Sequence, residues 1–549
     1  MTTTTTRIEA RRWLGRARAA ARVALRSGIL DAPSAKAVAV LLKQRAGGPL
    51  GVPALFRVHA AARGDHPAVI DRDGAVTYAE IDERIDRLAT GLRARLGLGA
   101  GDAAVIVLPN CREMIEAQAA LARLGAASVA VSWRSTAPEL EYIAEHSGAR
   151  AVIVGASVIG AVADARPRLT GVPERNYVVV GGEAPFGHAY DALVEQSPPE
   201  RRDGREGSVV IYTSGTTGKP KGAVRTFPED VVWAILHVLD ELPIRADDRH
   251  LAVCPMYHST AFGFISFTLV LGGTVVIEPF DPEGFLAAIE RHRITTTAVV
   301  PTMLHRVLEL PAEVRARYDT RSLHAVFSGG APLSGTLARH TIEELGHVLY
   351  NFYGATETGL NTLATPDELL RAPGTIGHAI AENEIRILDD AGLALPDGET
   401  GELWVKNGML VAGYHADAAA TSASMREGFF SVGDLAHRDA DGLYHLDGRK
   451  RDMIISGGVN VYPREVEEVL HAHPQVAEVA VVGVEDPEWG ERVRACVVPR
   501  DPAIDPAELI RWARERLAGP KVPREVRLLD ALPKNPTGKV LKRELRGLP

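Results

Sequence analysis

Hydrophobic and polar residues alternate from about residue 51 onward in a pattern that predicts helices and strands in turn. Residues 78–95 place apolar side chains at helical spacing, which indicates an amphipathic helix. Short apolar runs, separated by helical segments, predict buried strands at 103–108, 126–131 and 149–154. Strand–helix alternation is typical of parallel sheets covered by helices. We therefore expect an α/β fold with a large N-terminal domain of parallel-type sheets.

A change of pattern near residue 449 predicts a second, smaller domain. Residues 447–452 are charged, contain Gly448 and lack apolar periodicity, which is typical of a linker. The residues beyond it predict a small α+β unit with a helix from Pro463 and strands at 476–484 and 493–498. The expected organisation is an arm over residues 1–50, a large domain over 51–448 and a small C-terminal lid domain over 449–549.

The longest apolar run, from Phe262 to Ile277, is interrupted by polar residues and by Gly272-Gly273. It is shorter than the roughly 20 residues that a membrane-spanning helix needs. A buried helix, a glycine turn and a strand explain this run, so we predict no transmembrane span.

Residues 1–50 form a basic arm, in which the stretch from Arg7 to Arg26 has seven arginines and a single acidic residue, Glu9. At helical spacing one side gathers Trp13, Leu14, Ala17, Ala21 and Ala24, and most arginines lie on the other. Two interpretations fit this pattern: residues 7–29 contact an anionic membrane surface, or the helix is solvated and docks on the main body. An arginine-rich, acid-poor start is also typical of a transit peptide.

Composition narrows the class of protein. Hydrophobic residues make up 46% and charged residues 24% of the 549 positions, as in ordinary soluble proteins, and the net charge of −8 gives no reason to expect nucleic acid. The three cysteines are far apart, which predicts no disulfide framework and favours a reducing cytosol. We therefore expect a cytoplasmic protein, with membrane association through the arm left open.

Residues 212–222 predict a phosphate-binding loop that follows the apolar strand at 209–212. Gly215 and Gly218 allow backbone N–H groups to approach an anion closely. The loop adds donors and positive charge through Thr213, Ser214, Thr216, Thr217, Lys219 and Lys221. Its spacing differs from the common nucleotide loop, since Pro220 prevents a helix from continuing after the lysine.

Residues 350–359 form a second chemical signature. Glu357 stands between two hydroxyl residues and beside aromatic residues and glycines. Mg²⁺ prefers a carboxylate together with phosphate oxygens, so this pattern predicts a metal–phosphate site.

These two segments, with 327–332, 428–435, 447–463 and 533–542, resemble in content and order the motifs of the adenylate-forming superfamily. That superfamily includes acyl-CoA synthetases, luciferases and peptide-synthetase adenylation domains. The resemblance spans roughly residues 200–545. Within the superfamily, the sequence most resembles a fatty-acid–CoA ligase.

The resemblance implies roles for the nucleotide-binding residues. Glu357 would hold Mg²⁺ with help from Thr213, Thr356 would contact the α-phosphate, and Tyr353 would stack on adenine. Asp434 would bind the ribose hydroxyls and Arg449 the ribose and phosphate. The remaining ATP contacts would come from Ser214, Gly215, Thr216, Thr217, Lys221, Gly330, Ala331 and Pro332.

The resemblance also implies how the acid and coenzyme A are bound. Lys539 matches the catalytic lysine, which would act together with Thr356 and Glu357. His258, Phe262 and Gly354 would line the acid pocket, with the missing side chain at Gly354 making that pocket deeper. Coenzyme A would pass Ser456, Gly457 and Gly458, and Arg451 falls at the expected hinge of the mobile C-terminal domain.

The implied function is an AMP-forming acid–thiol ligase that uses ATP, Mg²⁺ and coenzyme A. Its acid would be a medium- or long-chain fatty acid, and its first step would be attack of the carboxylate on the α-phosphorus of ATP. Alternatives are an aryl-acid CoA ligase and a ligase that loads a carrier protein. A non-catalytic acyl- or nucleotide-binding protein is a different class, whose expected mark is loss of Glu357, Asp434 or Lys539. All three residues are present.

Overall fold

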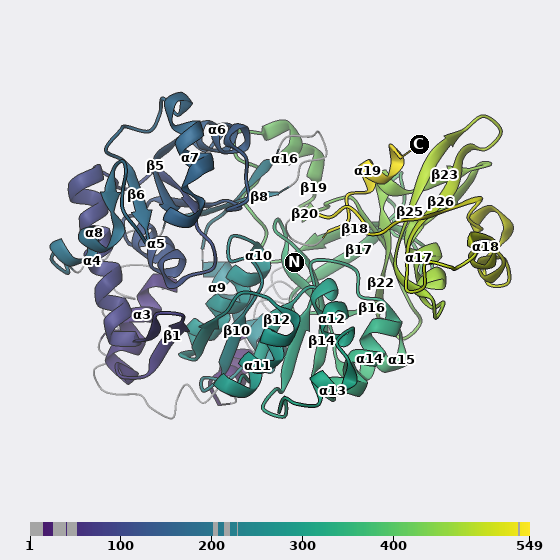
Figure 1. The fold of residues 1–549 in the computed structure, drawn as a ribbon, viewed down its shortest axis with the longest axis horizontal. Coiled ribbons are helices and arrows are strands. Elements are labelled where there is room, and N and C mark those ends of the chain that lie inside the picture. The colour runs from purple at the N-terminus through teal and green to yellow at the C-terminus, as the bar shows by residue number, and fades with distance from the viewer. Residues whose placement is uncertain are drawn as a thin grey trace, which may run out of the picture.

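The computed structural model describes residues 15–25, 40, 52–200, 207–213, 220–227, 229–535 and 539–548 (Figure 1). Within these ranges the strands form three sheets, of seven, 15 and five strands. The first two sheets and their helices make up a large lobe, and the third belongs to a smaller C-terminal lobe. This mixed α/β architecture with a smaller C-terminal part confirms the fold class expected from the sequence.

The seven-stranded sheet is built from β3 (Ala103–Val107), β4 (Ala127–Ala130), β5 (Ala149–Gly155), β6 (Tyr177–Val180), β7 (His188–Ala189), β8 (Val209–Thr213) and β9 (Lys221–Arg225). Its order is β7-β6-β5-β3-β4-β8-β9, and every neighbouring pair except β8–β9 is parallel. The N-terminal helices of the lobe are α3 (Val52–Arg63), α4 (Tyr78–Leu96), α5 (Arg112–Arg123), α6 (Ala137–His146), α7 (Ile159–Ala165) and α8 (Tyr190–Gln196).

Helix α4 shows how the sequence fixes an element. Thr77 and Glu80 form a capping box, in which each side chain binds the backbone N–H of the other residue. Gly97, at φ +72°, ends the helix in the left-handed conformation that favours glycine. The apolar residues that predicted the helix, Ile81 and Leu88 among them, are fully buried.

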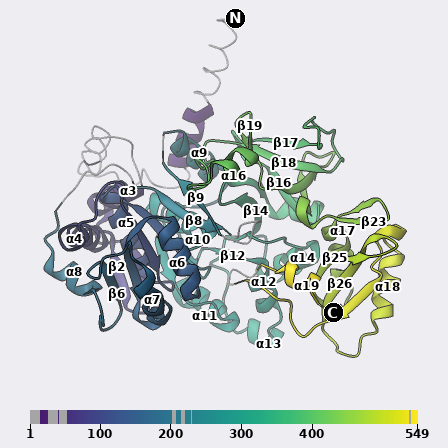
Figure 2. The same ribbon diagram turned by 90° about the horizontal axis from the view of Figure 1, so that it is seen from above.

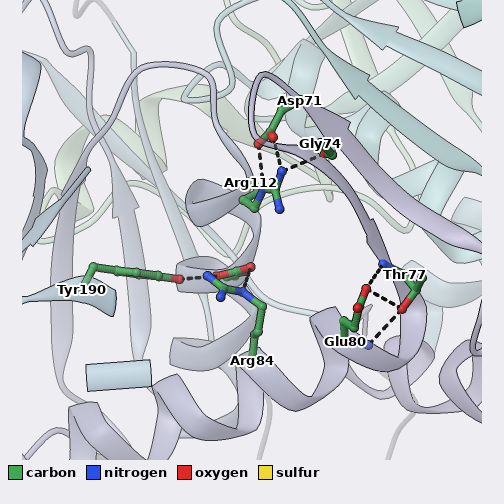
Figure 3. Close-up of polar contacts among 8 residues, drawn as sticks. Asp71, Gly74, Thr77, Glu80, Arg84, Arg112 and Tyr190 are labelled. Carbon is green, nitrogen blue, oxygen red and sulfur yellow. Dashed lines mark hydrogen bonds and ion pairs between the residues drawn. The ribbon is translucent and has the colours of Figure 1, made fainter. Parts of the chain in front are cut away.

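Polar contacts join α5 to its neighbours (Figure 3). Arg112 Nε donates to Asp71 Oδ2 at 2.8 Å and so ties α5 to the end of the first strand. Glu116 is completely buried and accepts from Arg84 Nε at 2.7 Å and from the Tyr190 hydroxyl at 2.6 Å. A carboxylate at this depth needs such partners, since an unpaired buried charge is strongly destabilising.

The 15-stranded sheet is built from β1 (Pro67–Asp71), β2 (Gly74–Thr77), β10 (Arg249–Ala252), β11 (Thr274–Ile277), β12 (Thr296–Val299), β13 (Ala325–Ser328), β14 (Leu349–Ala355), β15 (Gly359–Ala364), β16 (Thr375–Ala379), β17 (Glu384–Leu388), β18 (Gly401–Lys406), β19 (Met425–Arg426), β20 (Phe429–Phe430), β21 (Asp434–Arg438) and β22 (Tyr444–Arg449). Its helices are α9 (Glu229–Glu241), α10 (Ser259–Leu271), α11 (Pro282–His292), α12 (Pro301–Leu308), α13 (Ala312–Arg315), α14 (Gly335–Leu345), α15 (Pro366–Arg371) and α16 (Ala418–Ser424).

The pairing within this sheet changes at β14. From β1 through β11, β10, β12 and β13 to β14 the neighbours are parallel, whereas from β14 onward they are antiparallel. The run from 262 to 277 forms α10, the glycine turn and β11, as predicted. The antiparallel part is a feature that helix–strand alternation did not predict.

The C-terminal lobe contains β23 (Ile454–Ser456), β24 (Val459–Val461), β25 (Val476–Asp486), β26 (Gly490–Pro499) and β27 (Glu525–Leu528), with helices α17 (Pro463–His471), α18 (Pro506–Arg514) and α19 (Lys542–Arg546). Its own hydrophobic cluster includes Val466, Val481 and Leu509. The predicted linker at 447–452 is in part regular structure, because β22 continues to Arg449 and a 3₁₀ turn covers Lys450–Asp452. Pairing with β21 holds this charged segment in the sheet.

The N-terminal helix over residues 15–25 packs on the large lobe (Figure 2). Ala19 and Val23 are buried, whereas Ala21, expected on the apolar face, is exposed. Arg16, expected on the solvent side, lies 3.3 Å from Glu382. The predicted face was therefore wrong, because carboxylates of the large lobe draw arginine inward.

These described residues agree with the docked interpretation of the arm. Residues 7–14 and 26–29 of the segment considered for membrane contact lie outside the described ranges. Among the described residues, no helix combines the length and the hydropathy that crossing a membrane requires.

Candidate active site

A cavity of about 1000 Å³ lies between the two lobes and receives side chains from both. The large lobe contributes the ends of β14 and β22 and the helices α9 and α10, and the C-terminal lobe contributes α17 and the segment around Lys539. Predicted site residues that line this cavity are Lys221, His258, Phe262, Gly330, Ala331, Pro332, Tyr353, Gly354, Thr356, Glu357, Asp434, Arg449, Arg451 and Lys539.

One wall of the cavity is a buried polar cluster of Tyr353, Asp434 and Arg449. The Tyr353 hydroxyl donates to Asp434 Oδ2 at 2.8 Å, and Arg449 Nε lies 3.0 Å from Asp434 Oδ1. Asp434 and Arg449 are direct partners in the β21–β22 register, so the sheet holds this pair in place. Burial and the Asp434 carboxylate raise the pKa of Tyr353 well above its usual range, so its phenol stays a neutral donor.

Glu357 lies buried at the floor of the cavity, just beyond β14. The Tyr414 hydroxyl donates to Glu357 Oε1 at 3.0 Å, and the backbone N–H of Val411 donates to the Glu357 carbonyl at 2.9 Å. Lys221 Nζ lies 4.9 Å from the centroid of the Tyr414 ring, which brings a cation to the same floor.

The residues present fit a Mg²⁺ ion that is bound mainly through phosphate. In the part of the chain that the structure describes, no group of three or more His, Cys, Asp and Glu residues could hold a metal by itself. Mg²⁺ characteristically binds one or two carboxylates, several waters and substrate phosphates, and Glu357 supplies one such carboxylate.

Thr356 precedes Glu357 and faces α10. Its hydroxyl lies 3.2 Å from the Ser259 hydroxyl, and its carbonyl accepts from Arg225 Nη2 at 2.6 Å. Arg225 also donates to the Met409 carbonyl at 2.7 Å, and burial lowers its pKa to about 10, so it remains a cation near neutral pH. This buried cation fixes the backbone on which Thr356 and Glu357 stand.

The segment after β13 presents bare backbone to the cavity. A side chain at Gly329 would collide with the Phe352 ring, since an ideal Cβ would lie 2.3 Å from its Cζ atom. Gly330 has φ +76°, a conformation that L-residues with side chains rarely adopt. Glycine is thus required twice, and Gly330 and Ala331 of this segment line the cavity.

Lys539 reaches the cavity from the C-terminal lobe. Its backbone N–H donates to Asn535 Oδ1 at 2.8 Å, and the Asn535 N–H donates to the Lys539 carbonyl at 2.8 Å, so two hydrogen bonds hold Lys539 to Asn535. Burial lowers the pKa of the Lys539 ammonium to about 8, and the nearby positive charges of Arg449 and Arg451 act in the same direction. An anion placed beside it would restore the charged form.

Three polar contacts join the lobes around the cavity. Arg464 Nη2 donates to the Leu333 carbonyl at 2.9 Å, and the Ser334 hydroxyl lies 3.3 Å from His471 Nδ1. Arg500 Nη1 donates to Glu309 Oε1 at 3.1 Å. The first two contacts lie beside the Gly330 turn, so they set how the C-terminal lobe approaches that surface.

The end of the cavity nearest α9 and α10 is apolar, with lining from Val231, Ile235, Phe262, Phe264, Phe267 and Val270. His258 caps α10 and accepts from the Thr260 N–H at 3.4 Å. Burial, with a smaller effect from the Lys539 charge, lowers the pKa of His258 to about 4. His258 is therefore a neutral ring near neutral pH.

Gly354 lines the cavity, but the structure gives a different reason for glycine there. An ideal Cβ at Gly354 would lie 2.2 Å from the Gly359 carbonyl oxygen of β15. A side chain would therefore disturb the β14–β15 pairing. The argument that its absence deepens the acid pocket does not hold for this backbone.

One group of predicted residues does not line the cavity, and a second group lies outside the described residues. Among the described residues that line it, Ser456, Gly457 and Gly458 are absent, and they form the β23–β24 hairpin instead. Residues 214–219 of the predicted phosphate loop, with Ser214, Gly215, Thr216 and Thr217, and the side chain of Thr213, lie outside what the structure describes. The ends of that loop, Tyr212 and Lys221, both line the cavity.

Sequence reasoning missed Arg225, Ser259 and Tyr414. Arg225 ends β9, which also begins with a cation, Lys221, so the charge pattern of this strand did not single out Arg225. Ser259 and Tyr414 stand in segments without a comparable pattern, and only the fold brings them beside Thr356 and Glu357.

Comparisons with known proteins show the family to which the chain is similar. The family model for AMP-binding enzymes matches residues 56–415, and that for the AMP-binding enzyme C-terminal domain matches residues 465–539. A feruloyl-CoA synthase of Amycolatopsis sp is 37% identical over 89% of this chain and 97% of its own length. A long-chain-fatty-acid–CoA ligase of Mycobacterium tuberculosis is 32% identical over 86% and 93%. The ATP-bound structure of MatB from Rhodopseudomonas palustris superposes with a TM-score of 0.81, at 30% identity over 90% of this chain and 98% of that one.

Proposed function

Because this chain belongs to the AMP-binding enzymes, in the group of ATP-dependent acyl- and aryl-CoA ligases, we propose that it joins an apolar carboxylic acid to coenzyme A through an acyl-adenylate. The observation that carries this proposal is the single cavity in which Lys539 of one lobe faces Glu357, Asp434 and Arg449 of the other. A carboxylate is a poor electrophile, and such a set of charges suits its activation by ATP.

In the proposed first step, a carboxylate oxygen of the acid attacks the α-phosphorus of ATP, and the bond to the β-phosphate breaks to release pyrophosphate. Asp434 and Arg449 orient the ribose, and Tyr353 packs against the adenine ring beside the Gly330–Pro332 turn. Thr356 donates to the α-phosphate. These groups position the nucleotide and stabilise developing charge, which is what phosphoryl-type transfer asks of a protein.

Mg²⁺ would be held by Glu357, with Thr213 as a further ligand, and would neutralise charge on the departing pyrophosphate. The 213–217 loop and Lys221 contact the same phosphates in this proposal. Tyr414 has its own part, because its hydrogen bond orients the Glu357 carboxylate.

Lys539 bridges the acid carboxylate and the α-phosphate, two anions that otherwise repel. Its pKa of about 8 means that the free enzyme carries this charge incompletely at mildly alkaline pH. The two bound anions favour the ammonium form, so substrate binding completes the site electrostatically.

In the proposed second step, the sulfur of coenzyme A attacks the acyl carbon, the bond to AMP breaks, and the thiol proton passes to solvent. We propose that the C-terminal lobe, beyond the hinge near Arg451, rotates about Arg451 between the steps. That rotation would withdraw Lys539 and bring Ser456, Gly457 and Gly458 toward the acyl-adenylate, which accounts for their distance from the cavity in this arrangement.

The acid is proposed to be a large apolar one, because aromatic and branched side chains line the α9–α10 end. A fatty acid is the first candidate, because Phe262 belongs to this apolar lining. An aryl acid is the second candidate, since a feruloyl-CoA synthase is among the similar proteins. AMP release with ATP, Mg²⁺ and coenzyme A over a panel of fatty, arylacetic and cinnamic-type acids separates the two classes. Absence of acid-dependent AMP release from every member would contradict the proposed function.

A carrier protein as acyl acceptor is a third arrangement of the same chemistry. Free coenzyme A in the turnover assay tests it directly: thioester formation with coenzyme A supports the ligase proposed above. Adenylate that accumulates without transfer to coenzyme A would favour the carrier protein.

A further inference from the structure

The helix over residues 15–25 lies outside both matched family segments, the first of which begins at residue 56. It packs along α9, as the purple segment beside α9 shows (Figure 2). Its role is therefore not explained by the family and has to be read from its contacts.

Two arginines of this helix hold α9 near both of its ends. Arg16 Nη2 donates to Asp230 Oδ1 at 3.3 Å, and Arg22 Nε donates to Asp240 Oδ1 at 2.9 Å. Asp230 is the second residue of α9 and Asp240 the last but one. Arg16 also lies 5.4 Å from the centroid of the Trp233 ring, on the same side of α9.

Arg16 also contacts a residue outside α9. Its Nε donates to Glu382 Oε1 at 3.3 Å, and Glu382 stands in the turn between β16 and β17. The buried His237 ring of α9 also lies 3.6 Å from Glu382. The arm helix therefore joins α9 to the 15-stranded sheet through one carboxylate.

Apolar packing accompanies these ion pairs. Val23 is buried and belongs to the hydrophobic cluster that includes Ala234 and Val238 of α9. The same cluster contains Phe264 and Phe267 of α10, which line the cavity. Well-packed interiors transmit displacements between neighbours, because they contain few voids to absorb them.

The opposite side of α9 faces the proposed acid site. Val231 and Ile235 line the cavity, while Asp230, Trp233 and Asp240 meet the arm. The thickness of one helix, about 10 Å, separates the arm from the cavity. The arm therefore holds one side of α9, and the opposite side of α9 contacts the acid in the proposed complex.

From this placement we infer that the 15–25 helix is a brace that fixes α9 against the acid end of the cavity and so helps to determine which acids bind. The inference rests on the proposed function, because it assigns the α9–α10 end to the acid. The proposed nucleotide contacts Tyr353, Asp434 and Arg449 are on β14, β21 and β22 rather than on α9 or α10. Loss of the brace should therefore affect the acid and spare ATP.

The test compares the full chain with three variants: deletion of residues 2–26, Val23→Asp, and Arg18→Asp. Val23→Asp places a carboxylate in the buried contact, whereas Arg18 is exposed on the same helix and serves as the matched control. Steady-state kinetics give KM for the acid and for ATP, and amide hydrogen exchange over 229–241 reports whether α9 is held.

We expect deletion and Val23→Asp to raise the KM for the preferred acid about tenfold and to leave the KM for ATP within about twofold of its original value. The difference in kcat/KM between preferred and poor acids should become smaller. Exchange in α9 should rise in both variants and stay unchanged in Arg18→Asp. An unchanged KM for the acid with an undocked arm would overturn the brace, as would parallel losses for acid and ATP.

A charge exchange adds a rescue that a purely structural role would not require. Asp240→Arg places like charges opposite Arg22, and combining it with Arg22→Asp restores an ion pair of reversed polarity. The KM for the acid should rise in the Asp240→Arg variant and return to its original value in the double variant. A KM that stays high in the double variant would count against the Arg22–Asp240 ion pair as part of the brace. If the full chain shows no acid-dependent exchange of pyrophosphate, the proposed function fails instead, and the amide exchange of α9 still decides the brace.

Discussion

The two lobes contribute to the cavity in different ways. The large lobe offers a wall that is complete in itself, because Tyr353, Asp434 and Arg449 satisfy one another within paired strands. The C-terminal lobe offers Lys539, which is hydrogen-bonded to Asn535, and contacts such as that of Arg464 with the Leu333 carbonyl hold this lobe against the large one. Residues fixed in the large lobe suit a nucleotide that stays bound through both steps. A lysine on a lobe that can move away suits a positive charge that only the first step needs.

The largest expected effect separates the lobes by reaction step. Lys539→Ala should lower acid-dependent ATP–pyrophosphate exchange by about 10²–10³-fold, because it removes the cation that bridges two anions. Thioester formation from supplied acyl-adenylate and coenzyme A should stay largely intact. Lys521→Ala is the control, since Lys521 pairs with Glu465 at 2.7 Å elsewhere in the same lobe. Exchange that survives Lys539→Ala would remove Lys539 from the first step.

A change in the wall should instead affect both steps. Asp434→Ala leaves the Tyr353 hydroxyl and Arg449 without their shared partner, and we expect the KM for ATP to rise about 10- to 100-fold. Thioester formation from the adenylate should weaken similarly, because AMP occupies the same wall. Asp397→Ala, which removes an exposed pair with Arg438, is the control. An effect confined to one step would break the contrast between the lobes.

The pH dependence should follow the removable cation. Lys539 has a pKa of about 8, and its protonated form is the active one. The value of kcat/KM for exchange should therefore be level below about pH 8 and fall about tenfold per pH unit above it. Lys539→Arg, whose guanidinium stays charged, should show a lower but flat alkaline limb. An alkaline fall of the same shape in Lys539→Arg would assign it to another group.

The smallest effect is expected at the contact between lobes. Arg464→Ala removes the bond to the Leu333 carbonyl, and a single hydrogen bond is worth about 1 kcal/mol. Exchange should slow about two- to fivefold, with thioester formation unchanged. Arg511→Ala, on an exposed part of α18, should change neither rate. Equal slowing of both steps would argue for general damage to the lobe.

Much of the fold followed from the hydrophobic pattern, because α4 places apolar residues at helical spacing, while β3 and α10 are apolar runs of strand and helix length. The antiparallel end of the 15-stranded sheet did not, since β19 and β20 have two residues each and join the sheet where Phe430 pairs with the sequence-distant Val405 of β18. At that scale, pairing is decided by tertiary context rather than by local pattern.

The candidate site divides in the same way. Glu357, Asp434 and Lys539 stand in compact motifs, and the structure brings them to one cavity. Arg225 and Tyr414 are defined by the backbone carbonyl and the carboxylate that they reach across the fold, so no local pattern announced them.

The central claim is that the lobe carrying Lys539 must leave the wall between the two steps. The most direct measurement joins the lobes through Ser334→Cys and His471→Cys, at positions whose native side-chain atoms lie 3.3 Å apart, with a disulfide or a short crosslinker. In the joined protein, pyrophosphate exchange should persist and thioester formation should be lost, and reduction of the disulfide should restore it. Thioester formation at the normal rate while the lobes remain joined would contradict the account.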